Sequence, residues 1–91
     1  MKTHEILEQR GKTHGDFTDN ARLSQQLKYI VERSPNWDNM SDVQREALHM
    51  ILHKISRICA GNPDEPDHYA DIAGYATLVV ERLVPIKTNV V

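Results

Sequence analysis

The chain has 91 residues, enough for one small domain. Eleven Lys and Arg residues and 13 Asp and Glu residues are interspersed and give a formal net charge of −2. No basic stripe indicates nucleic acid and no Lys/Arg block indicates an anionic membrane, so both partner classes are disfavoured. The N-terminal segment lacks the apolar core of a signal peptide, and no apolar run is long enough to span a bilayer, so we expect a soluble, cytoplasmic protein.

Two helices are predicted in the first third of the chain. The first is short, spans about residues 3–10 from a threonine cap and ends at the glycine that follows. Residues 11–20 contain two glycines four positions apart and are predicted to form a loop. The second helix spans about residues 18–33, with Asp16 or Thr18 as its cap, and it ends before a Ser-Pro pair.

The strongest helix pattern follows a connector that contains the only tryptophan, Trp37, which we expect to pin this loop onto the helices. Ser41 and Gln44 form a capping box at the start of the helix. Apolar residues then recur at helical spacing and cover about half of the circumference, so this helix must be covered on two sides. Cys59 lies on the apolar face and is predicted to be a small buried hydrophobe. A Gly-Asn-Pro sequence ends the helix.

A last helix is predicted after an Asp64 cap, with Pro66 at its first position and Pro85 as its stop. Its central residue Gly74 costs about 1 kcal/mol relative to alanine, which suggests that another helix or a ligand approaches closely at that point. Residues 85–91 are predicted to be an exposed tail.

These elements predict one all-α domain over residues 1–91. No alternating strand pattern and no internal repeat is present. We expect a compact antiparallel bundle of one short and three longer helices, with an ordered core over about residues 3–84. A single core is only marginally sufficient at this size, so a homo-oligomer is expected to cover the excess apolar helix surface.

Three carboxylates form the main candidate site. Asp67 and Asp71 lie four residues apart on the last helix, and Glu46 lies on the antiparallel helix before it. Like charges at this spacing destabilise a helix unless a positive group lies between them. Mg²⁺, which binds a few carboxylates together with water and phosphate oxygens, would supply that charge, and pairing with Lys54 or Arg57 would do the same without a metal. Both interpretations stay open at this point.

Two further features carry weaker chemical signals. His49 and His53 are four residues apart, as in zinc-binding helices, but packed or solvated histidines give the same pattern. Residues 10–16 fit no phosphate-loop motif. They are predicted to form a flexible cationic loop before a helix N-terminus, which can still bind a phosphate. The alternative interpretation is a simple turn.

Three segments carry a family resemblance: RGKTHGDF at residues 10–17, EALHMILHKISRI at residues 46–58, and DHYADIAGYATL at residues 67–78. Together they resemble small phage and prophage proteins of uncharacterised function, which are distantly similar to the MazG-like all-α nucleoside triphosphate pyrophosphohydrolases. The resemblance covers about residues 5–83.

The enzyme resemblance implies a helical oligomer that binds Mg²⁺ with acidic residues and cleaves a nucleotide between its α and β phosphates. Such enzymes use Glu-x-x-Glu on one helix and Glu-x-x-Asp on the next. Glu46 matches the first glutamate and Asp71 the aspartate, whereas His49 and His68 occupy the other two positions. The implied catalytic residues are therefore Glu46 and Asp71, and Asp67 joins them as a metal ligand.

Two functional hypotheses follow. In the first, the protein is a MazG-like nucleotide-binding or nucleotide-hydrolysing protein, in which Lys54 and Arg57 bind the phosphates and His14 or Asp16 closes the site around Mg²⁺. In the second, it is a non-enzymatic phage protein that binds and inhibits a host defence complex, because half of the acidic set is missing and the helix surface is apolar in excess. A phage origin would place the protein in the host cytoplasm.

Overall fold

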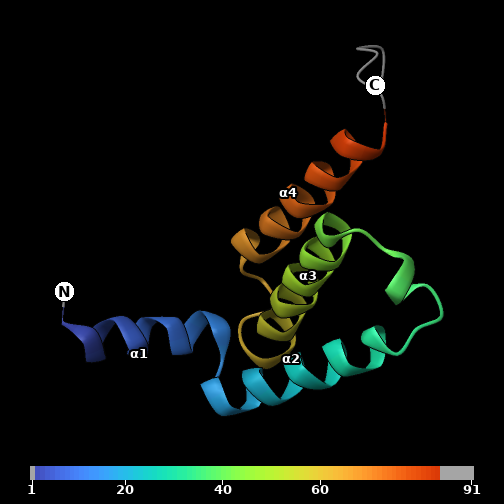
Figure 1. Cartoon of the computed structure of the whole chain (residues 1–91). Coiled ribbons are helices and arrows are strands. Elements are labelled where there is room, and N and C mark those ends of the chain that lie inside the picture. Colours follow the sequence, from blue (N-terminus) through green and yellow to red (C-terminus); the bar gives the residue numbers. More distant parts are fainter. Residues whose placement is uncertain (1, 85–91) are drawn as a thin grey trace.

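The computed structural model describes residues 2–84, and this range contains helices and no strand (Figure 1). The elements are α1 (Thr3–His14), α2 (Phe17–Glu32), a 3-10 turn (Trp37–Asn39), α3 (Asp42–Ala60) and α4 (Pro66–Leu83). The predicted all-α arrangement of one short and three longer helices is confirmed. The predicted tail at residues 85–91 lies outside the described residues. No described helix combines the length and the apolar composition needed to cross a membrane.

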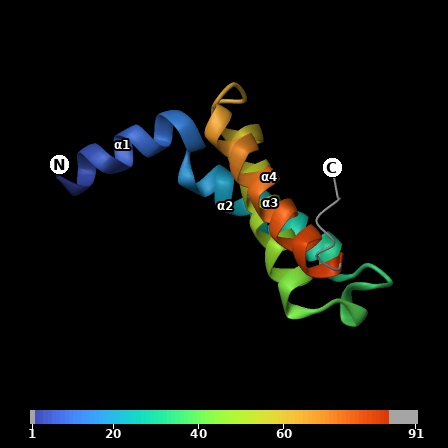
Figure 2. The same ribbon diagram turned by 90° about the horizontal axis from the view of Figure 1, so that it is seen from above.

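The helix α1 extends away from the other three helices and is joined to them at its C-terminal end (Figure 2). None of its residues is buried. The prediction that it ends at Gly11 is wrong: the helix continues to His14, and the chain turns only at Gly15, where φ is 81°. The predicted Thr3 cap is also wrong, because Thr3 is the first helical residue and the N-cap is Lys2, whose backbone N–H donates to the Glu5 carboxylate at 3.2 Å. Helical propensity outweighs a single exposed glycine here.

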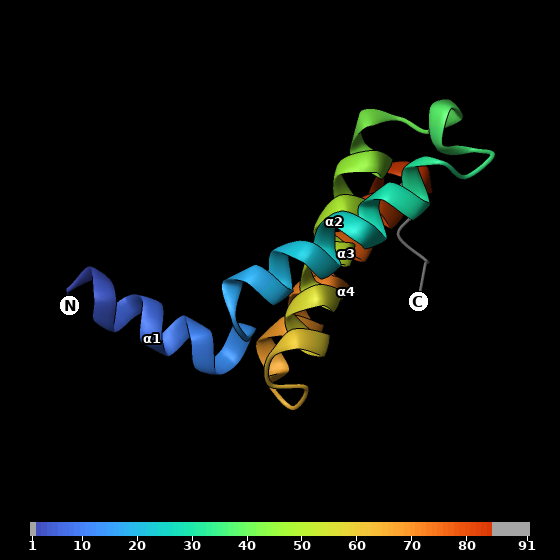
Figure 3. The same ribbon diagram turned by 90° about the horizontal axis from the view of Figure 1, so that it is seen from below.

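The helix α3 is the centre of the arrangement. Figure 3 shows α2 in front of it and α4 behind it, and these two pairings supply most of the contacts between helices. The prediction that the apolar arc of α3 is covered on two sides is confirmed. The large apolar residues of the arc (Leu48, Ile51, Leu52, Ile55 and Ile58) are nevertheless only half-buried in the single chain.

Several helix ends follow local sequence signals. The Ser41–Gln44 capping box is present, with hydrogen bonds of 3.1 Å and 2.8 Å. Of the two candidate caps of α2, Asp16 is the cap, so α2 begins one residue before the predicted start and the predicted loop shrinks to the Gly15–Asp16 junction. The cap of α4 is Glu65 and not Asp64, because the Glu65 carboxylate accepts the backbone N–H of Asp67 at 3.3 Å.

The interior of the described chain contains more polar than large apolar side chains. Its buried apolar residues are Trp37 and Ala47, and its buried polar residues are Asn20, Ser24, Ser56 and His68. Trp37 is 8% exposed, which confirms that it pins the connector. Cys59 is exposed, so its predicted burial is wrong: the elements within residues 2–84 leave that side of the last turn of α3 uncovered.

Candidate functional site

The junction between α1 and α2 lies directly on the turn between α3 and α4. A Cβ atom at Gly15 would overlap the carbonyl of Ala60, and one at Gly61 would overlap the backbone of Thr13. Gly15 also has a positive φ, which side chains rarely tolerate. The Asn62 N–H donates to the Thr13 carbonyl at 3.1 Å. Two glycines therefore let segments that are distant in sequence meet backbone to backbone.

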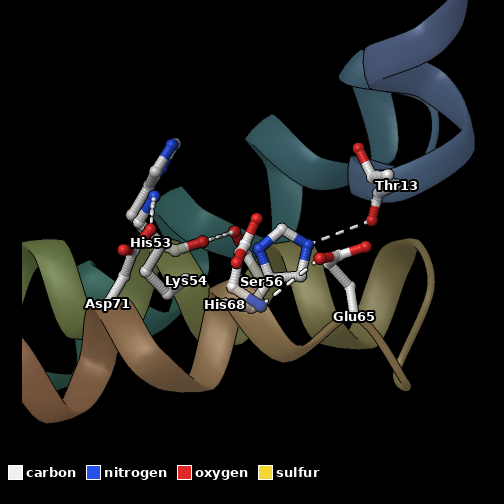
Figure 4. Close-up of polar contacts among 8 residues, drawn as sticks. Thr13, His53, Lys54, Ser56, Glu65, His68 and Asp71 are labelled. Carbon is white, nitrogen blue, oxygen red and sulfur yellow. Dashed lines mark hydrogen bonds and ion pairs between the residues drawn. The ribbon is translucent and has the colours of Figure 1, made fainter.

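His68 fastens α4 to the same junction. The side chain is 3% exposed, and its Nε2 donates to the Thr13 carbonyl at 3.1 Å (Figure 4). Because a carbonyl only accepts, this bond places the proton on Nε2. The centroids of the His68 and His14 rings are 5.3 Å apart. His68, which stands where the resemblance places a glutamate of the enzymes, therefore acts as a packing residue between α4 and the end of α1.

Polar side chains also join α2 to α3. The Ser56 hydroxyl lies 2.6 Å from both the Asn20 side-chain oxygen and the His53 carbonyl oxygen. The Asn20 amide donates to the His14 carbonyl at 3.4 Å, and the Ser24 hydroxyl lies 3.4 Å from Nδ1 of His53. Our sequence interpretation missed Asn20, Ser24 and Ser56. Small polar residues at helical spacing on facing helix sides are the signal that indicates them.

A cleft of about 490 Å³ opens beside this polar network, between the α1–α2 junction and α3. It is lined in part by Arg10, His14, Asp16, Asn20, His53 and Arg57, with the N-terminal end of α2 on one side. Three of the predicted substrate-binding residues, His14, Asp16 and Arg57, therefore lie together. The fourth, Lys54, is not part of this lining and pairs with α4.

The electrostatics of the cleft are dominated by Arg57. Burial lowers the pKa of its guanidinium, while the charge of Asp71 raises it. The buried Nε of Arg57 has no hydrogen-bond partner among the described residues. Burial, followed by the charge of Arg57, lowers the pKa of His14 and lowers that of His53 to about 4. At neutral pH the positive charge of the cleft therefore comes from its arginines, and His53 is neutral.

The three predicted carboxylates do not converge on one point in the structure. The Asp71 carboxylate is 2.9 Å from the Lys54 ammonium (Figure 4), whose hydrogen bond and charge lower the pKa of Asp71. Asp67 is exposed in the first turn of α4. Glu46 lines a different depression, near the C-terminal end of α4, and lies eight residues, or about 12 Å along the axis, from Lys54. The sequence left lysine pairing and metal binding open for Asp71, and the structure shows the pairing.

No group of three potential metal ligands occurs among residues 2–84. The expected convergence of Glu46, Asp67 and Asp71 is thus not present in the single chain. The two histidines of α3 also have separate surroundings: His49 lies 2.8 Å from the Glu32 carboxylate, and His53 lies against Ser24.

Comparison with known proteins gives one match. The model of a family described as "Domain of unknown function (DUF6378)" matches residues 2–83, nearly the whole chain. Neither a curated protein nor a solved structure matches the chain.

Proposed function

The chain belongs to DUF6378, a domain family of unknown function, and we propose from its own geometry that it binds the phosphate groups of a nucleotide in the cleft between α1, α2 and α3. The position of Arg57 carries this proposal. Its guanidinium lines the cleft together with Arg10, and its buried Nε has no partner among the described residues. A planar guanidinium matches two phosphate oxygens.

The surroundings of Arg57 support the same ligand class. The N-terminal end of α2 reaches the cleft at Asp16 and Phe17, where the helix dipole favours an anion and the Asp16 carboxylate already accepts the Asp19 N–H. His14 adds a ring nitrogen at the wall of the cleft. Asp71 holds Lys54 at 2.9 Å, and its charge raises the pKa of Arg57, so this aspartate favours the charged form of the guanidinium.

The finer proposal is that the nucleotide carries Mg²⁺, as the distant MazG-like resemblance implies. A phosphate-bound Mg²⁺ needs only one or two protein carboxylates, with water as its other ligands. Asp71, whose charge acts on Arg57, lies outside the cleft and would have to exchange its partner Lys54 for the ion, with Asp67 one turn before it on α4. Glu46 lies elsewhere and has no part in this version. The ion would neutralise phosphate charge.

The direct test is isothermal titration calorimetry with a panel of nucleoside triphosphates, with and without Mg²⁺. We expect Arg57→Gln to weaken binding by at least about tenfold, equivalent to about 1.4 kcal/mol. The matched control is Arg82→Gln, because Arg82 lies on α4 outside the cleft and donates to the Leu78 carbonyl of its own helix. Absence of binding to the unaltered protein at millimolar nucleotide contradicts the proposal. Pyrophosphate release, measured in parallel, tests for hydrolysis.

A second candidate function, binding to another protein chain, is supported by exposed apolar side chains. Large apolar residues are exposed on α2 and α4, among them Tyr29, Ile30, Tyr69, Val80 and Leu83. An apolar groove of about 300 Å³, lined by residues such as Leu48, Ile51 and Val79, runs between α3 and α4. Apolar surface of this extent is typical of contact sites. The partner is a second copy of the chain, in line with the expected homo-oligomer, or a host protein of a phage.

Sedimentation equilibrium tests the oligomer. Substitution of Leu83 by glutamate is expected to lower the measured mass towards the 10.4 kDa of one chain. A single-chain mass for the unaltered protein at all concentrations excludes a homo-oligomer. Capture of a stoichiometric host protein, lost in the Leu83→Glu variant, then supports the phage–host version.

A further inference from the structure

Phe17 is the most exposed large apolar side chain among residues 2–84, at 81% of its full accessible surface. It is the first residue of α2 and directly follows the Asp16 cap. Moving a phenylalanine ring from water into an apolar contact is favourable. Neither the packing of α2 nor the phosphate-binding proposal gives this ring a contact.

The position of Phe17 connects two adjoining hollows. One is the cationic cleft, which it lines together with Arg10 and Arg57. The other is a smaller recess of about 160 Å³ along α2, lined by Phe17, Asn20, Ala21, Ser24, Gln25, Lys28 and His53. Phe17, Asn20 and His53 line both. The ring therefore stands between the arginine-lined cleft and a recess whose lining surface is mainly apolar.

From this placement we propose that Phe17 is the stacking platform for the base of the bound nucleotide, whose base edge is directed to the recess at Gln25. The inference rests on the proposed phosphate binding at Arg57. Every nucleobase has a flat π face, and an exposed aromatic ring is a general stacking surface for it. The phosphates then lie towards Arg57 and the base over Phe17, so the ligand spans the two hollows.

The polar groups of the recess narrow the choice of the residue that contacts the base edge. The Asn20 amide is engaged on both sides, with Ser56 and with the His14 carbonyl. Gln25 is exposed on the outward side of α2, and an amide both donates and accepts, as a base edge requires. Lys28 adds three donors and no acceptor. Gln25 is therefore the residue that pairs with the base.

The neighbours of Phe17 favour a small ligand over a protein partner. Interface cores are depleted in charged residues, whereas Phe17 is flanked by Arg10 and Asp16 in one hollow and by Lys28 in the other. The cleft volume of about 490 Å³ also lies within the range of small-molecule sites.

The experiment measures, for each variant, the binding of one ligand that contains a nucleobase and of one that does not. The probes are a nucleoside triphosphate and inorganic tripolyphosphate, both measured by calorimetry. The test variant is Phe17→Leu, which keeps an apolar side chain but removes the π face, and the matched control is Phe17→Trp, which keeps a stacking surface. A thermal melt of each variant confirms that α2 is folded.

We expect Phe17→Leu to weaken binding of the nucleoside triphosphate by at least about fivefold, while tripolyphosphate binding is unchanged. Phe17→Trp is expected to keep or raise the affinity for the nucleotide. Gln25→Ala is expected to change the preference among bases without affecting tripolyphosphate.

The outcomes separate this inference from the function on which it rests. If neither probe binds the unaltered protein, the phosphate-binding proposal fails and the stacking proposal falls with it. If tripolyphosphate binds but Phe17→Leu leaves nucleotide affinity unchanged, only the stacking proposal is overturned. A Phe17→Leu variant that changes the oligomeric mass and not the nucleotide affinity assigns the ring to a chain–chain contact and overturns the proposal.

Discussion

The two ends of α3 are held by different kinds of contact. At its N-terminal end, Trp37 and Ala47 are buried, and apolar residues of α3 face Val79 of α4 across the groove. At its C-terminal end, Ser56 and His68 are buried, and both are hydrogen-bonded to other elements. The cleft with Arg57 adjoins only the second end.

This difference indicates where the geometry of the fold is specified most strictly. Apolar contacts stabilise in proportion to the area buried and tolerate small shifts. Buried hydrogen bonds contribute about 0.5–1.5 kcal/mol net, but a broken one leaves an unsatisfied group and costs more. The polar end therefore fixes the orientation of α1, α2 and α4 around the cleft, whereas the apolar end supplies surface burial.

The largest expected effect is that of Gly15→Ala at the polar end. The backbone conformation alone costs a non-glycine residue about 1–3 kcal/mol, and the Cβ would also overlap the Ala60 carbonyl. We expect loss of α1 docking and a destabilisation above about 3 kcal/mol, measured by urea unfolding and by protease cleavage next to α1. The control is Gly11→Ala, where nothing lies within 4 Å of the added Cβ. Equal stability of both variants contradicts the close packing at Gly15.

At the apolar end, Trp37→Ala is expected to destabilise the protein by about 3 kcal/mol, the lower end for a buried aromatic residue. The ring packs beside His49, at 5.0 Å between centroids, and Arg45 donates to its backbone carbonyl. Because this end is remote from the cleft, nucleotide affinity of the folded fraction should be unchanged. Urea unfolding and calorimetry measure the two quantities. A loss of affinity larger than the loss of stability shows that the ends are coupled.

A smaller effect is expected from Ser56→Ala, which leaves the buried Asn20 side-chain oxygen without its donor. The expected cost is about 1–3 kcal/mol in unfolding free energy. The comparison variant is Thr77→Ala, whose hydroxyl bonds to the Ala73 carbonyl on an exposed helix surface, with an expected change below about 0.5 kcal/mol. If the two variants are equally stable, the polar network does not hold α2 on α3.

The polar end should also respond to acid. The pKa of His53 is lowered from 6.5 to about 4, by burial and by the nearby charges of Arg57 and Lys28, so the unfolded state binds a proton that the folded state does not. The folded state therefore has its full stability with respect to His53 above pH 6.5 and loses it as the pH falls from 6.5 towards 4. Melting temperatures across this window should fall less steeply for His53→Gln. An unchanged slope removes His53 as the cause.

The smallest expected effect is a gain. Gly74→Ala on α4 adds a Cβ that meets no atom within 4 Å, so the close approach predicted for Gly74 is not made by another helix within residues 2–84. The substitution should stabilise α4 by up to about 1 kcal/mol, measured as a raised melting temperature. Destabilisation would indicate that a second copy or a ligand packs against Gly74 in solution.

Local signals in the sequence determined most helix ends. The Ser41–Gln44 box, the Asp16 cap and Pro66 at the start of α4 are each confirmed, because a cap depends on residues within one turn. The predicted end of α1 at Gly11 failed because an exposed glycine weakens a helix without stopping it. The predicted burial of Cys59 was wrong because the spacing of apolar residues shows which side of a helix faces its neighbours, but not how far along the helix those neighbours extend.

Tertiary structure decided the composition of the candidate site. The sequence singled out His14, Asp16 and Arg57, and the close contact at Gly15 brings them to one cleft, although their separation along the chain gives no hint of it. The register of α4 against α3 places Asp71 beside Lys54. Glu46 lies about 12 Å away from Lys54 along α3, so Asp71 does not meet it. Helix formation is a local property of the chain, so the sequence alone determined the helices. The register and crossing of helices are set by contacts between distant residues, so only the tertiary structure decided which charged side chains meet.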